Sequence, residues 1–104
     1  MQATRVYLVR HGETEWNNLG RYQGHSDTVL NANGQRQAEL LRQRFYRIHL
    51  DTAYASDLKR ARETADTIVA PQGLEVNLEP GLREIKFGAW EGLTYQEVTA
   101  AYSK

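Results

Sequence analysis

Residues 5–14 read Arg5-Val-Tyr-Leu-Val-Arg-His-Gly-Glu-Thr14, and this stretch decides how the rest of the chain is interpreted. Its first half, residues 5–9, is mostly apolar and contains two β-branched valines, whereas polar side chains follow at once. The pattern predicts a short buried strand that ends in a polar loop. What that loop can bind depends on the sheet to which the strand would belong.

Two later segments have the spacing of amphipathic helices. Residues 17–34 come first and are rich in Gly, Asn and Asp, which predicts an irregular loop. Beyond it, apolar residues recur in two segments at intervals of 3, 4 and 3, which predicts one buried face on each of two helices. These residues are Ala38, Leu41, Phe45 and Ile48 in the first helix, and Leu58, Ala61, Ala65 and Ile68 in the second.

Capping residues suggest where these helices begin and end. Asn31 or Asn33 could cap the first helix, and Ser56 or Asp57 could cap the second. The Pro-Gln-Gly sequence at residues 71–73 would end the second helix at about residue 70, because proline and glycine interrupt helices.

Short apolar segments at residues 52–55 and 74–78 predict two further strands. Residues 79–93 look like a loop, and a capping box at residues 94–97 opens a third helix that continues through Tyr102. Strands therefore alternate with helices, which predicts an α/β fold with three layers, α/β/α, and a mainly parallel sheet. Because ligands bind beyond the carboxyl ends of parallel strands, residues 10–12 and 56–60 should share one edge of the sheet and form the site.

The composition excludes several classes of protein. The chain has 104 residues, which fits one domain at most, with 40% hydrophobic and 25% charged residues, as in globular proteins. Lys and Arg number 13 and so do Asp and Glu, so no global basic field is available for nucleic acid or anionic membranes. Any anion must be bound by a local cluster of cations.

Cysteine is absent from the sequence, which excludes disulfides and thiolate metal sites and fits a reducing cytoplasm. We expect no signal peptide, because the first residues lack a long apolar stretch and a small-residue cleavage site. No apolar run approaches the roughly 20 residues of a membrane helix.

His11 is the first candidate for chemistry. Gly12 after it allows a ligand to approach the backbone closely, and Arg10 before it offers a bidentate cation. A neighbouring cation favours the neutral imidazole, which is the form that can attack a phosphoryl group. A lone histidine is more often a surface or core residue, and we interpret His25 and His49 as surface residues because neither has a partner with metal-ligand spacing.

Arg60 and Glu84 are the other two candidates. Arg60 opens the second predicted helix, where a cation is unfavourable for the helix dipole and a functional role is therefore plausible. Glu84 lies between apolar neighbours, and partial desolvation would favour its protonated form, as a general acid needs. We expect other charged residues of these segments to be solvated, namely Lys59, Arg62, Glu79, Glu91 and Glu97.

Four ordered segments resemble the histidine phosphatase superfamily, in its phosphoglycerate-mutase-like branch. Residues 8–14 (LVRHGET) resemble its signature, and Asn17 followed by residues 21–24 (RYQG) resembles its first substrate loop. Residues 56–65 (SDLKRARETA) resemble the element with its second phosphate-pocket arginine, and residues 82–92 (LREIKFGAWEG) the element with its acid. The resemblance runs from residue 5 to about residue 98.

The resemblance implies a role for each matching residue. His11 would be the nucleophile that forms a phosphohistidine, and Glu84 would protonate the leaving oxygen and then activate water. Arg10, Arg60 and Asn17 would hold the phosphoryl oxygens. The substrate side would be lined by Gln23 and Gly24. The family needs no metal, because arginines supply the positive charge, and we expect no cofactor for the phosphomonoesterase.

The chain also departs from the family pattern. The family has a second pocket histidine in a His-Gly segment far downstream and more strands than this sequence predicts, and the chain ends inside a predicted helix. We therefore expect residues 1–104 to be the N-terminal half of one histidine-phosphatase domain. A degenerate short form is the alternative.

Three functions remain open. The first is a metal-independent phosphomonoesterase for a small phosphorylated metabolite. Residues 87–92 (FGAWEG) resemble the phosphatase members of the family, particularly α-ribazole-5′-phosphate phosphatases and broad-specificity relatives, more than the mutases. The resemblance to α-ribazole-5′-phosphate phosphatases implies a role in cobalamin biosynthesis. The second is a cofactor-dependent phosphoglycerate mutase, which must exclude water from the phosphohistidine. The third is a non-catalytic module that binds a phosphorylated ligand. Aromatic residues near the predicted pocket could line it or pack the loops: Trp16, Tyr22, Phe87 and Trp90.

Overall fold

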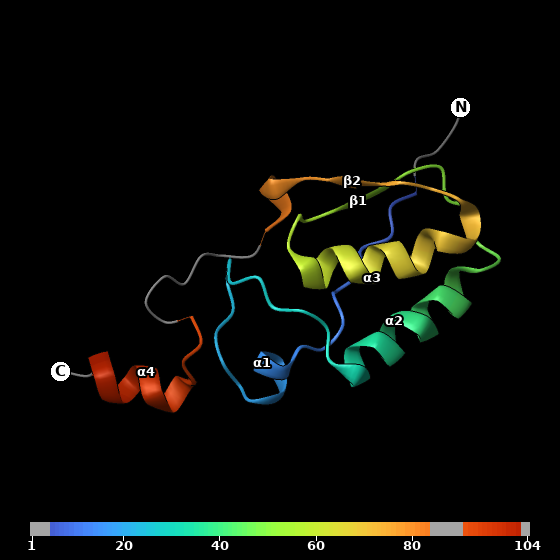
Figure 1. The fold of residues 1–104 in the computed structure, drawn as a ribbon. Coiled ribbons are helices and arrows are strands. Elements are labelled where there is room, and N and C mark those ends of the chain that lie inside the picture. Colours follow the sequence, from blue (N-terminus) through green and yellow to red (C-terminus); the bar gives the residue numbers. More distant parts are fainter. Residues whose placement is uncertain (1–4, 84–90, 103–104) are drawn as a thin grey trace.

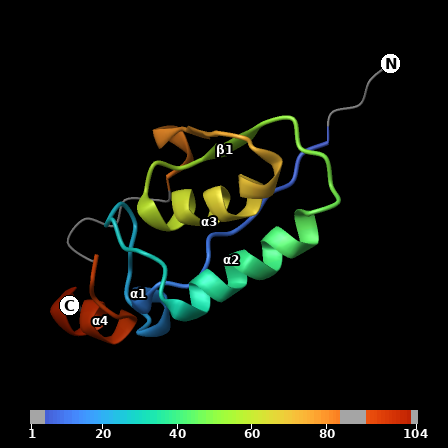
Figure 2. The same cartoon turned by 45° about the vertical axis from the view of Figure 1, so that its right-hand side comes forward.

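The computed structural model describes residues 5–83 and 91–102. Its elements in chain order are α1 (Glu15–Asn18), α2 (Ala32–Phe45), β1 (Ala53–Ala55), α3 (Lys59–Val69), the 3-10 helix η1 (Ala70–Gln72), β2 (Val76–Leu78), the 3-10 helix η2 (Pro80–Leu82) and α4 (Tyr95–Tyr102). In Figures 1 and 2, α3 lies beside the two strands, α2 packs along α3, and α4 lies near α1 at the other end of the molecule.

The two strands confirm the predicted parallel α/β class. β1 and β2 pair in parallel, with Ala53 opposite Val76 and Ala55 opposite Leu78, and α3 forms the crossover between them. The core centres on Phe45 of α2 and on Ile68 and Val69 at the end of α3, with side chains of both strands packed against it. The helical spacing read from the sequence therefore identifies faces that are buried in the structure.

Helices α2 and α3 lie on the same side of the two strands in both views, so the described elements supply one of the two expected helical layers (Figures 1 and 2). Tyr54, in the middle of β1, is 64% exposed. No helix in the described ranges is long and apolar enough to span a membrane.

The strand predicted at residues 5–9 is wrong for this structure. Residues 5–13 have no regular secondary structure, and Val6 and Leu8 are 72% and 94% exposed. A strand requires a hydrogen-bonded neighbour, and no backbone hydrogen bond joins residues 5–9 to another described segment. The segment is held by side-chain packing instead: the rings of Tyr7 and Phe45 meet edge to face, with their centroids 5.3 Å apart.

The predicted loop at residues 17–34 is only partly irregular. The four-residue helix α1 overlaps its beginning, and α2 starts before its end. Thr14 caps α1, since its hydroxyl accepts the N–H of Asn17 at 3.1 Å. Asn31 caps α2, as predicted: its side-chain oxygen accepts the N–H of Gly34 at 2.8 Å.

The caps proposed for the second helix are wrong. The N-cap of α3 is Leu58, which has no side chain able to cap. The Ser56 hydroxyl accepts the N–H of Leu58 instead, at 3.1 Å, and the Asp57 carboxylate pairs with Arg83. A distant carboxylate caps the helix, because Asp27 accepts the N–H of Lys59 at 2.7 Å.

The capping box predicted for the last helix is half formed. The Thr94 hydroxyl accepts the N–H of Glu97 at 3.2 Å, just before α4 begins. The Glu97 carboxylate accepts from the Thr94 hydroxyl at 3.1 Å and pairs with Arg21 at 3.1 Å. This ion pair ties α4 to the segment that follows α1.

Two glycines allow the segment after residue 10 to lie directly on the start of α2. A Cβ atom on Gly12 would come within 2.6 Å of the carbonyl oxygen of Gly34. A Cβ atom on Gly34 would overlap the carbonyl oxygen of Glu13. The Glu13 carboxylate also accepts from the amides of Asn31 and Asn33, at 2.9 and 3.1 Å. The contact is therefore close at the backbone and reinforced by side chains.

We expect Gly34→Ala to lower the free energy of unfolding by about 1–3 kcal/mol, because a methyl group has no space against Glu13. The usual gain of alanine over glycine in a helix would offset part of this loss. Urea denaturation measures the difference. Gln35→Ala, at an exposed position one residue later, is the control and should change stability little. Equal stability of Gly34→Ala and wild type would contradict the close contact.

Candidate functional site

His11 lies in the irregular segment that runs past α2 and α3, and its ring is half-buried. Its Nδ1 is 2.6 Å from the carbonyl oxygen of Gly12. A carbonyl only accepts hydrogen bonds, so Nδ1 carries the proton in this arrangement and, in the neutral ring, Nε2 carries the lone pair. The local backbone thus selects the tautomer in which Nε2 carries the lone pair.

The backbone next to His11 is held from the opposite side by α3. The N–H of Gly12 donates to the hydroxyl of Thr64 at 3.0 Å, and this hydroxyl donates to the carbonyl of Arg60 at 2.8 Å. Thr64 is 3% exposed. Neither hydrogen bond of the Thr64 hydroxyl is therefore open to competition from bulk water.

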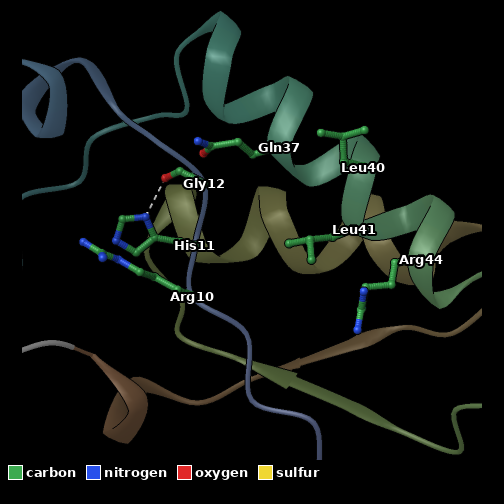
Figure 3. A pocket seen from close by; sticks show the side chains of 7 residues that line it. All are labelled: Arg10, His11, Gly12, Gln37, Leu40, Leu41 and Arg44. Carbon is green, nitrogen blue, oxygen red and sulfur yellow. Dashed lines mark hydrogen bonds between the residues drawn. The ribbon is translucent and has the colours of Figure 1, made fainter.

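The polar side of this segment lines an open hollow that contains three of the predicted site residues. Arg10, His11 and Asn17 line it, together with Glu13 and Gln37. A second hollow of about 480 Å³ adjoins it and extends along α2 to Arg44. Figure 3 shows Arg10 and His11 side by side on the segment that faces α2, with the hydrogen bond from the His11 ring to Gly12. The arrangement combines a cation with a histidine of defined tautomer.

Asn17 is oriented by the cap of α1. Its Oδ1 accepts the N–H of Thr14 at 3.0 Å. Because the carbonyl end of the amide faces Thr14, the amide nitrogen is the end that could donate to an anion in the hollow.

Gln23 and Gly24 are buried and do not line the hollow described above. Gln23 is 5% exposed, and its Oε1 accepts the hydroxyls of Thr14 and Thr28 at 2.6 and 2.5 Å. Gly24 adopts a positive φ of 55°, a conformation suited to glycine. Direct contact of these two residues with a substrate stays a prediction.

Arg60 is 1% exposed, and its guanidinium contacts the loop at residues 24–28. Its guanidinium donates to the carbonyls of Gly24 and Ser26, both at 2.6 Å, and to the Thr28 hydroxyl at 3.3 Å. Since Asp27 caps α3 beside it, the start of α3 holds this loop by two independent contacts. The interaction of Arg60 with a phosphoryl group stays a prediction.

Glu84 lies outside the described residues, as do Phe87 and Trp90. The residue before Glu84 is held by two hydrogen bonds. Arg83 donates from Nε to the Asp57 carboxylate at 2.6 Å and from Nη2 to the other carboxylate oxygen. This two-point contact ties the chain at residue 83 to the start of α3. The guanidinium of Arg83 also lowers the pKa of the Asp57 carboxyl, chiefly through these hydrogen bonds.

The remaining predictions on charged residues have mixed outcomes. His49 is exposed, as expected, and pairs with Asp51 at 3.0 Å. His25 is half-buried rather than a surface residue, and its backbone N–H donates to Glu91 at 3.3 Å. Glu91 also accepts from the Ser26 hydroxyl, so it supports the loop at residues 24–28 and is not simply solvated. Arg62 is solvated as predicted, with an i,i+4 contact of 3.7 Å to Asp66.

Sequence reasoning missed three residues that support the site: Thr64, Gln37 and Gly34. Thr64 holds Gly12, and the Gln37 side chain accepts the N–H of Glu13 at 2.8 Å. Their helical positions carry no local signal of these contacts, because the partners are distant in sequence. Within the described ranges, no three His, Cys, Asp or Glu residues form a group that could hold a metal.

Comparison with known proteins gives a family match. The model of the histidine phosphatase superfamily (branch 1) matches residues 6–104. Phosphoserine phosphatase 1 of Hydrogenobacter thermophilus is 46% identical over 98 residues, which cover 94% of this chain and 46% of that protein. A protein of Serratia proteamaculans named as a probable phosphoglycerate mutase, GpmB, is 49% identical over 87 residues, covering 84% of this chain and 40% of that protein.

Solved structures agree with the fold. A putative α-ribazole-5′-P phosphatase from Escherichia coli K-12 superposes with a TM-score of 0.86 at 35% identity, over 90% of this chain and 48% of that chain. The chain thus spans less than half the length of the curated relatives and of the solved structure that it matches.

The Asp57–Arg83 pair makes stability depend on pH in the acid range. Because the folded-state pKa of Asp57 is lowered, its contribution is present above the unfolded pKa of about 3.9 and is lost as the pH falls through the folded value. We expect Asp57→Asn to flatten the loss of stability below about pH 4. Urea denaturation at several pH values measures this.

Asp66→Asn is the matched control, because the contact of Asp66 with Arg62 is longer and both side chains are more than half exposed. If the free energy of unfolding fell as steeply below about pH 4 in Asp57→Asn as in wild type, the Asp57–Arg83 pair would not contribute to the loss of stability in acid.

Proposed function

Because this chain belongs to the histidine phosphatase superfamily (branch 1), we propose that the protein that carries it is a metal-independent phosphomonoesterase. His11 would form a phosphohistidine intermediate. The observation that carries the proposal is the 2.6 Å contact of Nδ1 with the Gly12 carbonyl, which leaves Nε2 as the nitrogen with the lone pair. The substrate would be a small phosphorylated metabolite.

The reaction has two steps. In the first, Nε2 of His11 attacks phosphorus, the N–P bond forms, and the bond from phosphorus to the leaving oxygen breaks while Glu84 gives that oxygen a proton. In the second, Glu84 takes a proton from water, the water oxygen bonds to phosphorus, and the N–P bond breaks. Inorganic phosphate is released and both residues return to their starting state.

The positive charge that this reaction needs would come from arginines. Arg10 lies beside His11 and could bind two phosphoryl oxygens, because its planar guanidinium matches their spacing. Asn17 would donate from its amide nitrogen, which the cap of α1 turns away from Thr14. Arg60 would have two roles, since it holds the loop at residues 24–28 and would also face the phosphoryl group.

Glu84 is the proposed acid and base. The neighbouring residue, Arg83, makes two hydrogen bonds to Asp57, which tie residue 83 to the start of α3, three residues before Arg60 in sequence. A carboxylic acid can serve both steps, because the proton that it loses in the first is recovered from water in the second.

The leaving group defines the specificity, and the relatives point to two classes of small metabolite. The names of the relatives include a phosphoserine phosphatase and a putative α-ribazole-5′-P phosphatase. We propose that the substrate is a small phosphomonoester of this kind, with α-ribazole 5′-phosphate as the candidate from the sequence and phosphoserine as the candidate from the 46% identical relative. An α-ribazole substrate would place the protein in cobalamin biosynthesis.

A phosphoglycerate mutase is the second candidate, because one relative with that name is 49% identical. A mutase would use the same His11 chemistry but return the phosphoryl group to a second hydroxyl. The two functions differ in whether water reaches the phosphohistidine.

The first experiment traps the intermediate. The protein that carries this chain is mixed with a ³²P-labelled phosphomonoester and quenched rapidly. We expect acid-labile, base-stable label on His11, and a loss of turnover by several orders of magnitude in His11→Ala, as for other enzymes that lose their nucleophile. His49→Ala, which removes an exposed histidine, should retain both label and turnover.

Normal turnover of His11→Ala would refute the proposed nucleophile. Binding of phosphomonoesters by the wild type without turnover, even of p-nitrophenyl phosphate, would favour the non-catalytic module instead.

The second experiment separates hydrolase from mutase. Release of inorganic phosphate from phosphoserine, α-ribazole 5′-phosphate and 3-phosphoglycerate is compared with conversion of 3- to 2-phosphoglycerate. We expect phosphate release to dominate, because residues 87–92 resemble the phosphatase members of the family more than its mutases. Isomerisation that is faster than phosphate release would establish the mutase.

A further inference from the structure

We propose that Thr64 is a positioning residue that holds the nucleophile's backbone against α3, so that the His11 imidazole keeps the tautomer and direction in which Nε2 attacks. The inference rests on the proposed function of His11. Thr64 itself is not assigned any contact with the substrate.

The geometry consists of a chain of three hydrogen bonds. The Thr64 hydroxyl donates to the Arg60 carbonyl at 2.8 Å, which is one turn earlier in α3. The same hydroxyl oxygen accepts the N–H of Gly12 at 3.0 Å, and the carbonyl of Gly12 then accepts from Nδ1 of His11 at 2.6 Å. A rigid helix is thereby connected to the ring through the two polar groups of a single residue.

The hydroxyl is well suited to this task because it both donates and accepts. Donation to Arg60 orients its hydrogen along the helix, so that a lone pair of Oγ1 faces Gly12. Since Thr64 is 3% exposed, water cannot readily replace the hydroxyl when it is removed. The N–H of Gly12 would then have no acceptor in a buried position.

A second contact limits where Gly12 can move. Its backbone lies against Gly34 at the start of α2, where a Cβ atom would approach within 2.6 Å. Gly12 is thus held by Thr64 of α3 and confined by Gly34 of α2. Loss of the Thr64 hydroxyl removes the attraction but not the steric limit, so we expect rotation about the φ and ψ bonds of Gly12 rather than a large shift of the segment.

The N–H and the carbonyl of Gly12 belong to adjacent peptide units, and rotation about the Gly12 backbone bonds between them would turn the carbonyl that accepts from Nδ1 and weaken the selection of the tautomer. The reactive nitrogen would then be protonated in part of the molecules, and the ring would point in the wrong direction in others. Misplacement of a reacting group by about 1 Å can reduce rates by about 100-fold. The expected signature is a fall in kcat with KM nearly unchanged, because Thr64 is not part of the phosphate-binding group.

The test uses Thr64→Val and Thr64→Ser in the protein that carries this chain. Valine keeps the shape of threonine and removes the hydroxyl, whereas serine keeps the hydroxyl. With p-nitrophenyl phosphate we expect Thr64→Val to lower kcat and the rate of phosphohistidine formation by about 10- to 100-fold, and Thr64→Ser to stay within about threefold of wild type.

Thr67→Val is the matched control. The Thr67 hydroxyl also donates to a carbonyl one turn earlier in α3, that of Glu63 at 2.8 Å, and Thr67 has no hydrogen bond to the His11 segment. A general effect of valine on the helix would therefore appear in both variants. A loss of kcat confined to Thr64→Val supports positioning, whereas equal kcat losses in the two valine variants would overturn it.

Nuclear magnetic resonance tests the proposal without turnover. In wild type we expect the ¹⁵N shifts of His11 to report a proton on Nδ1 and the Gly12 amide to exchange slowly with solvent. In Thr64→Val both features should weaken, and in Thr64→Ser they should persist. Fast exchange of the Gly12 amide in wild type would overturn the inference even if Thr64→Val failed to fold.

The two proposals can fail separately. Normal turnover in His11→Ala would refute the nucleophile and with it any positioning role in this reaction. A phosphohistidine on His11 together with an unchanged kcat in Thr64→Val would refute the role of Thr64 alone.

Discussion

The hydrogen bond from the Gly12 N–H to the Thr64 hydroxyl, at 3.0 Å, is the interaction on which the arrangement of the site depends. Residues 5–13 have no regular secondary structure, so the sheet does not place His11. Its position comes from α3 through Thr64 and from α2 through the close contact with Gly34. Glycine is required on both sides of that contact, because a side chain at either position would keep the two backbones apart.

The start of α3 also organises the loop at residues 24–28. Asp27 supplies the anion that a helix N-terminus favours, and it accepts the N–H of Lys59 at 2.7 Å. Arg60 is a cation at the unfavourable end of the helix dipole, but its guanidinium is satisfied by the carbonyls of Gly24 and Ser26. The loop therefore offsets the unfavourable position of this cation at the start of the helix, and the guanidinium is held at residues 24–28.

Local patterns in the sequence predicted the longer helices, one of their caps and the parallel strand pair correctly. The spacing of apolar residues identified α2 and α3, and the Asn31 cap and the parallel pairing of β1 with β2 followed from simple rules. The strand at residues 5–9 was wrong because an apolar, β-branched segment becomes a strand only beside a partner. The caps expected from Ser56 and Asp57 were wrong because both side chains have nearby competitors, the N–H of Leu58 and the guanidinium of Arg83.

The sequence by itself determined the family and the candidate chemistry, because residues 8–14 form a contiguous motif that contains Arg10 and His11. Only the tertiary structure decided how these residues are held. The tautomer of His11 depends on the direction of the Gly12 carbonyl, and the N–H of the same glycine is held by Thr64, which follows Gly12 by 52 residues. A hydrogen bond between residues so far apart leaves no pattern in either local sequence, since it exists only when packing brings α3 against the segment.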